Sequence, residues 1–162
     1  MTQLSNVTYD EIEIGQTACY TKTVEERDLQ LFAAVSGDAN PLHLDEAFAA
    51  TTVFGGRIAH GMLTGAYISA AIAMQLPGPG TVYLGQSLRF RLPVKIGDTL
   101  SVQLEVTEKR DRRKTVTLEC KVFNQNEKMV ASGTAEVMAP TQKVLIDRPE
   151  LPVVEIRPHE QS

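Results

Sequence analysis

The chain has 162 residues, of which 43% are hydrophobic and 22% are charged, as in an ordinary globular protein. This length fits one domain and allows a substantial core. The net charge of −4 argues against nucleic acid as the main partner, because phosphate binding needs a dominant basic face. The two cysteines, Cys19 and Cys120, have no metal or redox spacing, and two free thiols are typical of a reducing cytoplasm.

The first predicted elements are a strand and a helix. Residues 1–15 are polar and acidic, whereas a secretory leader is basic and then apolar. Residues 17–23 are predicted to form a strand. Thr23 and Glu26 have the spacing of a capping box, so we expect a helix to start there. Gly37 is suited to the left-handed position that ends such a helix.

A loop is predicted over residues 38–43. Asn40 precedes a proline and is therefore disfavoured in the helical region, and Pro41 lacks a backbone donor. Asp45 can then cap a short helix over residues 46–50. The sequence thus predicts a proline-constrained loop between two helices.

An uncharged stretch runs from Gly61 to Leu76. It predicts a helix that is stopped by the Pro- and Gly-rich residues 77–80. The stretch is too short to span a bilayer comfortably, and Gly, Ser, Thr and Gln interrupt it, so we expect no membrane segment. A helix that is uncharged on every side is more often buried in a core.

After residue 80 the hydrophobic residues recur with a period of two. This alternation predicts antiparallel strands with one apolar face, over residues 82–92, 100–106, 116–122 and 128–138. Charged and polar clusters at 109–114 and 124–127 are predicted hairpin turns. An apolar helix and such a sheet bury their apolar surfaces together if the sheet curls around the helix, which predicts an α+β fold.

The alternation fades from Thr141 onward, and Pro149, Pro152 and Pro158 follow. We therefore expect a domain over residues 1–140. Residues 141–162 are predicted to form an extended tail that lies on the surface or is disordered.

The densest group of polar residues lies between Ser36 and Asp45. Asp38 and His43 can both move protons, and a tight loop could direct both at one point. The alternative is that Asp38 is a turn former and His43 a packed loop histidine, because this composition is common in turns. His43, Asp45 and Asp38 also offer three metal ligands, but they lack a distinctive spacing and a plausible fourth ligand, so we expect no metal.

The run SGDANPLHLDEAFAATTVFGGRIAHGML (residues 36–63) closely resembles the hydratase-2 motif of MaoC-like, (R)-specific enoyl-CoA hydratases. The run YLGQSLRFRLPVKIGDTL (residues 83–100) looks like the next strands of that family, and the resemblance extends over roughly residues 10–138. It implies the hot-dog fold, in agreement with the predicted helix and sheet. It also implies a homodimer with active sites at or near the subunit interface, and no metal or redox cofactor.

By motif position, the resemblance implies that Asp38 and His43 are the catalytic pair. It implies that the main-chain N–H of Gly61 holds the thioester oxygen, and that Ser69 lies beside the site and bonds to the catalytic aspartate. Asn40 and His60 are then expected to orient the loops that carry these groups.

The proposed chemistry requires these residue types. Water adds to C3 of an enoyl thioester only if the charge that develops on the thioester oxygen is stabilised, and a main-chain N–H at a helix N-terminus can do so. Ionised Asp38 and neutral His43 can hold one water between them, from which one proton must leave while C2 gains one. If one water supplies both the hydroxyl and the proton, addition is syn. The sequence leaves open which residue moves which proton.

Other residues near the motif have two interpretations each. Gly61 could instead serve tight helix packing. Ile72 follows Ser69 by almost one helical turn and could line the acyl pocket, or it could be core. Arg57 and the basic hairpin over residues 109–114 could meet coenzyme A phosphates, although charge-rich hairpins are usually only solvated.

The sequence therefore predicts a cytoplasmic hydro-lyase that converts trans-2-enoyl-CoA to (R)-3-hydroxyacyl-CoA. It would link fatty-acid β-oxidation to users of (R)-3-hydroxyacyl thioesters, such as polyhydroxyalkanoate synthesis. One alternative is the reverse reaction, as a dehydratase of (R)-3-hydroxyacyl thioesters on acyl carrier protein. A thioesterase is disfavoured because the hydratase motif is intact. A non-catalytic acyl-thioester sensor would leave Asp38, Asn40 and His43 unexplained.

Overall fold

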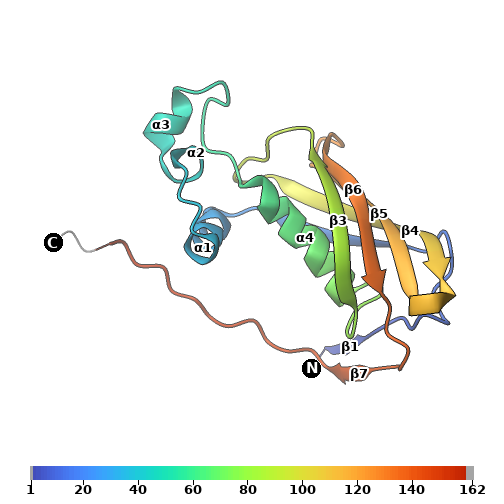
Figure 1. Cartoon of the computed structure of the whole chain (residues 1–162). Helices are drawn as coiled ribbons and strands as arrows, with labels where there is room; N and C mark the ends of the chain where they lie inside the picture. The colour runs from blue at the N-terminus through green and yellow to red at the C-terminus, as the bar shows by residue number, and fades with distance from the viewer. Residues whose placement is uncertain (1, 160–162) are drawn as a thin grey trace.

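The structure is a computed structural model that describes residues 2–159. In chain order its elements are β1 (Gln3–Ser5), β2 (Thr17–Thr23), α1 (Glu26–Ser36), α2 (Pro41–Leu44), α3 (Glu46–Ala50), α4 (Gly61–Met74), β3 (Val82–Phe90), β4 (Thr99–Arg110), β5 (Thr115–Phe123), β6 (Met129–Met138) and β7 (Leu145–Asp147). An antiparallel sheet of order β2–β4–β5–β6–β3 packs on one face against α4, and α1, α2 and α3 gather beside the N-terminal end of that helix (Figure 1). The predicted α+β architecture is confirmed.

The alternating pattern of β4 and β5 explains how the sheet covers α4. Every second residue of these strands is buried toward the helix, and the intervening residues are more exposed. The buried positions are Leu100, Val102, Leu104, Val106, Val116, Leu118, Cys120 and Val122. From α4 they meet a buried surface that includes Ile68, Ala71 and Ile72. Within residues 2–159, no helix has both the length and the apolar character needed to cross a bilayer.

The start of α1 differs from its prediction. The residue that caps the helix is Glu25, whose side chain forms a reciprocal capping box with Asp28. Thr23 instead ends β2, where its hydroxyl bonds the hydroxyl of Thr99 at 2.9 Å. The end of the helix is confirmed, because Gly37 has a φ of 80° in the left-handed region.

The segment predicted as a loop contains a short helix, α2. The Oδ1 of Asn40 accepts the N–H of Leu42 at 3.0 Å and so caps that helix. Pro41 occupies the first helical position, where the missing N–H has no helical partner to lose. The proline therefore begins a helical turn here, and the loop prediction for residues 41–43 was wrong. The next helix is confirmed, with Asp45 accepting the N–H of Phe48.

The strand β3 lies at the edge of the sheet and pairs only with β6. Its sequence alternation predicts one buried face, but in the single chain nearly all of its side chains are exposed. Only Leu88 is partly buried, whereas Val82, Leu84 and Phe90 face solvent. An edge strand lacks a neighbour on one side, and the helix covers it incompletely.

The two ends of the described chain meet in a small second sheet. The strand β1 pairs antiparallel with β7, so that Gln3 lies opposite Asp147. Both strands are three residues long, and the sequence did not predict either of them. Beyond β7 the chain runs extended and exposed along residues 148–159 (Figure 1).

Candidate active site

The predicted site residues Asp38, His43, His60 and Gly61 lie where α1 and α2 meet the N-terminal end of α4. The turn after α1 is built from short local hydrogen bonds. The Oγ of Ser36 accepts the N–H of Asp38, and the Oδ1 of Asp38 accepts the N–H of Asn40, both at 3.1 Å. Because Asn40 then caps α2, this relay fixes the position of Asp38 relative to the helix that carries His43.

The imidazole of His43 has one ring nitrogen committed to the backbone. Its Nδ1 lies 2.7 Å from the carbonyl oxygen of Ile58, so that Nδ1 carries a proton and donates it. The Nε2 of the neutral ring is then an acceptor, and it lies 3.9 Å from Oδ2 of Asp38. At that separation one water can lie within about 2.8 Å of both atoms. His43 is buried, while the carboxylate of Asp38 is half-exposed.

His60 contacts both Asp38 and His43. Its ring is buried and stacks on that of His43, with centroids 3.8 Å apart. Its Nε2 donates to the main-chain carbonyl of Asp38 at 3.0 Å. One side chain thus touches both members of the pair, which supports the orienting role predicted for His60. Its Nδ1 is buried without a hydrogen-bond partner.

Asp38, His43 and His60 each offer one atom that could bind a metal, and these atoms lie within 4.8 Å of one another. The two imidazole planes are only 29° apart, so the lone pairs in those planes run side by side. A tetrahedral zinc site needs lone pairs that converge on one point about 2 Å from each nitrogen. Asp45 is occupied with capping α3. The arrangement therefore favours proton transfer over metal binding.

Gly61 is the first residue of α4, where the helix leaves main-chain N–H groups without helical acceptors. A Cβ at this position would lie 3.0–3.1 Å from the ring of Phe90 on β3. A cavity of about 310 Å³ opens here, and its mostly apolar walls include Phe54, Ile58, Gly61, Phe90, Leu92 and Val130. No sequence pattern marks Phe90 as a site residue, because only the packing of β3 on α4 brings its ring there.

Ser69 and Ile72 lie away from this group within one chain. Ser69 shares one face of α4 with Gly61 and Gly65, and it is about 12 Å further along the axis at 1.5 Å per residue. No hydrogen bond joins it to Asp38 among the described residues. Ile72 is 1% exposed and belongs to the hydrophobic core, and it lines none of the described cavities. The predicted roles of both residues stay predictions, and core packing is the better supported role for Ile72.

Neither Arg57 nor the basic hairpin over residues 109–114 lies free beside the site to bind coenzyme A phosphates. Arg57 forms ion pairs with Glu46 at 2.9 Å and with Glu26 at 3.0 Å, and the hydrogen bond that it donates to Glu46 is the largest cause of its raised pKa. Its charge is therefore already neutralised by its neighbours. The hairpin over residues 109–114 lies at the opposite end of the sheet from Phe90, because Thr115 pairs with Met138, which pairs with Val82.

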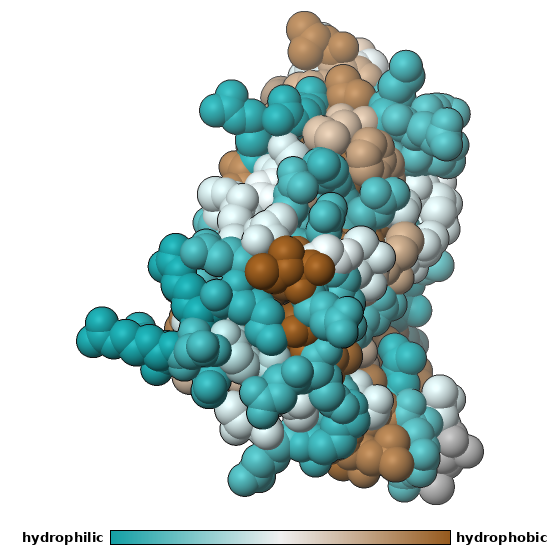
Figure 2. Space-filling view, turned by 90° about the vertical axis from the view of Figure 1, so that its right-hand side faces the viewer, coloured by the Kyte–Doolittle hydropathy of each residue, from teal (hydrophilic) through white to brown (hydrophobic). Residues whose placement is uncertain are grey.

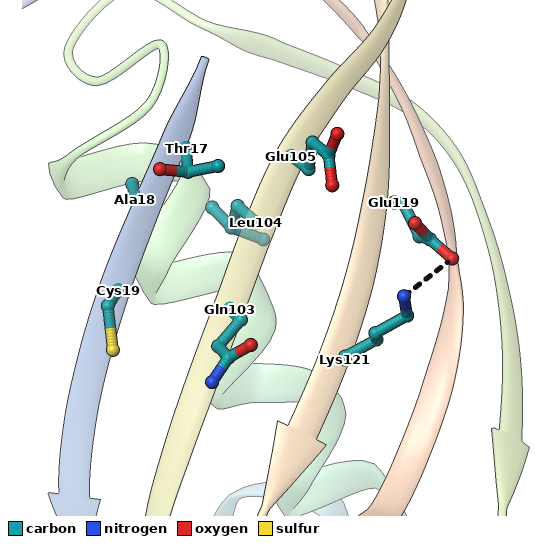
Figure 3. Close-up of a pocket in the computed structure, with 8 residues that line it drawn as sticks. All are labelled: Thr17, Ala18, Cys19, Gln103, Leu104, Glu105, Glu119 and Lys121. Carbon is teal, nitrogen blue, oxygen red and sulfur yellow. Dashed lines mark ion pairs between the residues drawn. The ribbon is translucent and has the colours of Figure 1, made fainter. Parts of the chain in front are cut away.

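The outer face of the sheet has a shallow hollow of its own, about 430 Å³ in volume. In Figure 3 its polar side chains lie on the strands with α4 behind them, so the sheet separates it from the catalytic pair. Glu119 and Lys121 form an ion pair there at 3.2 Å. That side of the molecule is largely hydrophilic, with small apolar areas (Figure 2). None of the predicted site residues lines this hollow.

Comparisons with known proteins agree with the geometry. Residues 10–127 match the family described as "MaoC like domain". The (R)-specific enoyl-CoA hydratase of Rhodospirillum rubrum is 46% identical over 136 residues, which cover 83% of this chain and 92% of that protein. The structure of the R-hydratase PhaJ1 from Pseudomonas aeruginosa superposes with a TM-score of 0.92 at 59% identity, covering 96% of this chain and all of that one. A mitochondrial 3-hydroxyacyl-[acyl-carrier-protein] dehydratase of Arabidopsis thaliana is 34% identical, over 85% of this chain and 84% of that protein.

Proposed function

The chain belongs to the MaoC-like domain family, and we propose that it hydrates trans-2-enoyl-CoA to (R)-3-hydroxyacyl-CoA as a hydro-lyase. The observation that carries this proposal is the pairing of Asp38 with Nε2 of His43, whose other ring nitrogen bonds the carbonyl of Ile58, beside the N-terminus of α4. This arrangement offers two proton acceptors for one water and one donor for a developing oxyanion. Those are the groups that a hydration across an enoyl thioester requires.

The reaction proceeds in two linked steps. The thioester oxygen accepts the main-chain N–H of Gly61, and the acyl carbons occupy the apolar cavity bordered by Phe90. The water held by Asp38 and His43 transfers a proton to one of them as its oxygen bonds to C3. The electrons of the double bond move onto the thioester oxygen, where the positive end of the α4 dipole stabilises the charge. The same proton then passes to C2, so that one water is consumed and addition is syn.

Coenzyme A is the preferred carrier in this proposal. The relatives named (R)-specific enoyl-CoA hydratase are 45–46% identical to this chain, whereas those named dehydratases of acyl-carrier-protein substrates are 27–34% identical. The Aeromonas caviae structure, which is 45% identical, is described as involved in polyhydroxyalkanoate biosynthesis. We infer the same metabolic setting in the cytoplasm for this chain, with the catalytic domain over residues 1–140 and no cofactor.

A homodimer is part of the proposal. The edge strand β3 has free hydrogen-bonding groups along one side, and its side chains Val82, Leu84 and Phe90 are exposed and apolar. A strand of this kind is suited to pair with a second copy of itself about a two-fold axis. Because Phe90 also borders the site cavity, the dimer contact and the site would adjoin each other.

The test is a hydration assay with crotonyl-CoA, with an eight-carbon enoyl-CoA and with crotonyl-acyl carrier protein. We expect loss of enoyl-thioester absorbance, an (R)-3-hydroxyacyl product, and faster turnover of the coenzyme A thioesters. Asp38→Asn and His43→Gln should each lower kcat/KM by at least ~100-fold, as removal of a positioned acid or base does. Prolonged chelation should leave activity unchanged.

The matched control is Glu119→Gln on the outer face of the sheet, which should behave as the wild type. Near-normal turnover by either variant of the catalytic pair, with circular dichroism unchanged, would falsify the mechanism. Activity that vanished with chelator and returned with a divalent metal would replace it with a metal site at Asp38, His43 and His60. Preference for the carrier-protein substrate would favour the dehydratase alternative.

A further inference from the structure

Residues 148–159, here called the C-terminal arm, are extended and exposed along their whole length. Leu151 is 90% exposed and Val153 fully so, while Val154 and Ile156 are about two-fifths exposed. In Figure 1 the arm leaves β7 and runs past α4 toward the side of the molecule where α1 lies. An extended segment that leaves two apolar side chains almost fully exposed and two more partly exposed is typical of a segment that binds another surface.

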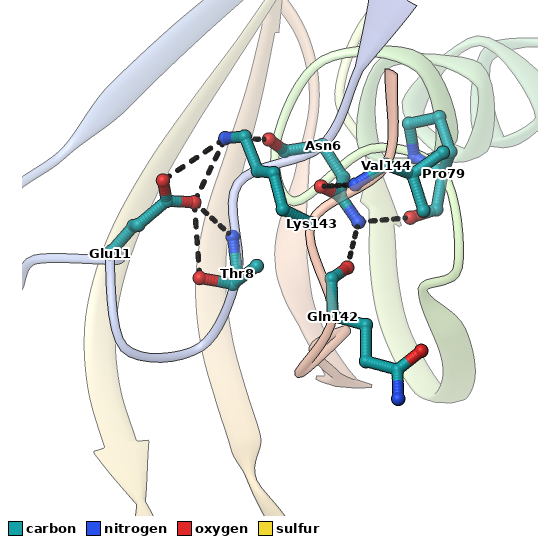
Figure 4. A network of polar contacts seen from close by, with 7 residues as sticks. All are labelled: Asn6, Thr8, Glu11, Pro79, Gln142, Lys143 and Val144. Carbon is teal, nitrogen blue, oxygen red and sulfur yellow. Dashed lines mark hydrogen bonds and ion pairs between the residues drawn. The ribbon is translucent and has the colours of Figure 1, made fainter. Parts of the chain in front are cut away.

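The arm starts from a rigid base. The side chain of Asn6, which is fully buried, donates to the carbonyls of Pro79 and Gln142 and accepts the N–H of Val144, at 2.9–3.1 Å (Figure 4). Lys143 donates to the carbonyl of Asn6 at 2.6 Å. Together with the β1–β7 pairing, these bonds fix the point and direction from which the arm departs.

The same Lys143 forms an ion pair with the carboxylate of Glu11 at 2.9 Å. That carboxylate also accepts the N–H of Thr8 at 2.8 Å, so the base is joined to the N-terminal segment at two places. The base of the arm is therefore held by bonds to three separate segments of its own chain.

The base lies at the Val82 end of β3, because Asn6 bonds Pro79 just before that strand. If β3 pairs antiparallel with β3 of a second copy, the Val82 end of each subunit lies beside the Phe90 end of the other. The site is at the Phe90 end. In such a dimer the arm of one subunit therefore departs next to the site of the other. Its twelve residues, at about 3.3 Å each when extended, reach about 40 Å.

The segment that surrounds the site has a matching surface. Val35 at the end of α1 is 86% exposed, Val53 after α3 is 96% exposed, and Phe48 on α3 is partly exposed. These apolar side chains flank the helices that carry Asp38 and His43. Among the described residues of one chain, Val35 and Val53 are left almost uncovered and Phe48 is covered only in part.

We propose that the C-terminal arm of each subunit crosses the dimer interface and packs on the α1–α3 surface of the other subunit, beside its catalytic pair. The occupant of that surface is thus a second copy of this chain. The inference rests on the homodimer of the proposed function, but it goes beyond it by assigning a part of each site's surroundings to the other subunit.

A mixed cross-linking experiment on the full-length chain tests this placement. Both partners carry Cys19→Ser, because Cys19 is the exposed cysteine. Cys120 can stay, because its burial raises the pKa of the thiol to about 11 and keeps it unreactive. One chain then carries Val153→Cys and a differently tagged chain carries Val53→Cys. After subunit exchange, a short bis-maleimide should join the two chains into a covalent heterodimer.

The control pairs Val153→Cys with Glu119→Cys on the outer sheet face, which should give no heterodimer. A single chain carrying both Val53→Cys and Val153→Cys should also form covalent dimers. If it gave only an internally linked monomer, the arm would pack on its own chain and the inference would be overturned.

Sedimentation of the wild type separates the two proposals. A dimer that forms no Val153–Val53 heterodimer would overturn the arm placement and leave the hydratase proposal standing. A monomer would overturn both the homodimer and the arm placement. If the wild type is a dimer and the predicted cross-link forms, the double variant Leu151→Asp/Val153→Asp should raise the dimer dissociation constant at least ~10-fold. The control variant Glu150→Gln should not change it. Inactivity of the wild-type dimer in the hydration assay would count against the proposed reaction alone.

Discussion

The two nitrogens of the His43 ring face different groups, and this difference defines the chemistry of the site. The carbonyl of Ile58 holds the proton on Nδ1, and Nε2 faces Asp38. The buried ring of His60 lies flat against His43 and bonds the main chain of Asp38. We therefore expect His60 to maintain the geometry of Asp38 and His43 without contacting the water that they would hold.

This difference predicts unequal losses for the two histidines. His43→Gln should lower kcat/KM for crotonyl-CoA by at least ~100-fold, because the acceptor for the water's proton is removed. His60→Gln keeps an N–H donor for the Asp38 carbonyl but loses the ring that stacks on His43. We expect a smaller loss of roughly tenfold, as for other groups that orient a functional histidine. Steady-state kinetics at saturating and limiting substrate measure both losses. Equal losses would mean that His60 takes part in proton transfer.

Gly61→Ala tests the proposed oxyanion donor. The added Cβ would meet the ring of Phe90 at 3.0–3.1 Å and occupy the space in front of the helix N-terminus. We expect kcat/KM to fall by about 10²–10³, the loss typical of removing an oxyanion donor. Stability should change little, because the Phe90 ring is half-exposed and can turn aside.

Gly65→Ala is the matched control one turn along α4. Its Cβ would meet only the flexible ends of Leu88 and Met62, at 3.3 Å or more. Alanine also has the higher helix propensity, by about 1 kcal/mol. This variant should keep near-normal activity, and a loss equal to that of Gly61→Ala would point to general disturbance of the helix.

The contact between β3 and β6 depends on Gly133. A Cβ on this residue would lie 1.9 Å from the main-chain oxygen of Ser87, so β3 would have to move. We predict that Gly133→Ala lowers the free energy of unfolding by about 3 kcal/mol, the upper range for overpacking, because backbone cannot rotate away as a side chain can. Urea unfolding measures the change. Gly85→Ala, with open space at its Cβ, should cost less than about 1 kcal/mol.

Local sequence patterns predicted the elements that depend on local rules. Strands β4, β5 and β6 were predicted from the period of two after residue 80, a strand was also predicted at β2, and α3 was predicted from its cap Asp45. The strand β1 and its partner β7 were missed, because three-residue strands carry no pattern and pair across almost the whole chain. The exposure of β3 could not be predicted either, because it depends on the order of strands in the sheet.

The same distinction holds for the site. The family motif predicted Asp38, His43 and Gly61 as a group, and the structure brings them to one end of α4. The bond from His43 to Ile58, the stacking of His60 and the approach of Phe90 all depend on tertiary packing. Pro41 was misjudged because the same residue that blocks a helix interior is well suited to the first helical position.

The ends of the molecule are held by a charged contact whose strength depends on pH. The N–H of Thr8 and the ammonium of Lys143 lower the pKa of Glu11 from 4.5 to about 2. Because the folded-state pKa is lowered, the contribution to stability is complete above about pH 4.5 and is lost as the pH falls toward 2. We predict that the difference in the free energy of unfolding between wild type and Glu11→Gln narrows between pH 6 and pH 3. Denaturant unfolding across that range measures it.

Glu13→Gln is the control for that titration, because no contact of the Glu13 carboxylate is described nearby. Its difference from the wild type should stay constant over the same range. If the Glu11→Gln difference also stayed constant, the ion pair with Lys143 would contribute nothing to holding the chain ends together.

The pairing of β1 with β7 has a consequence for how the chain is made. Asn6 is synthesised long before two of its side chain's three partners, the carbonyl of Gln142 and the N–H of Val144, which lie 136 and 138 residues further along the chain. The sheet and α4 can assemble earlier during synthesis, yet the segment around Asn6 must wait until residues 142–147 have been made. A truncated chain that lacks residues 142–147 would therefore leave the side-chain amide of Asn6 without two of its hydrogen-bond partners, at a cost of about 1–3 kcal/mol. Such a chain would unfold locally more often and be cleaved more readily by a protease. The junction of β1 and β7 thus makes the stability of the segment around Asn6 depend on residues 142–147.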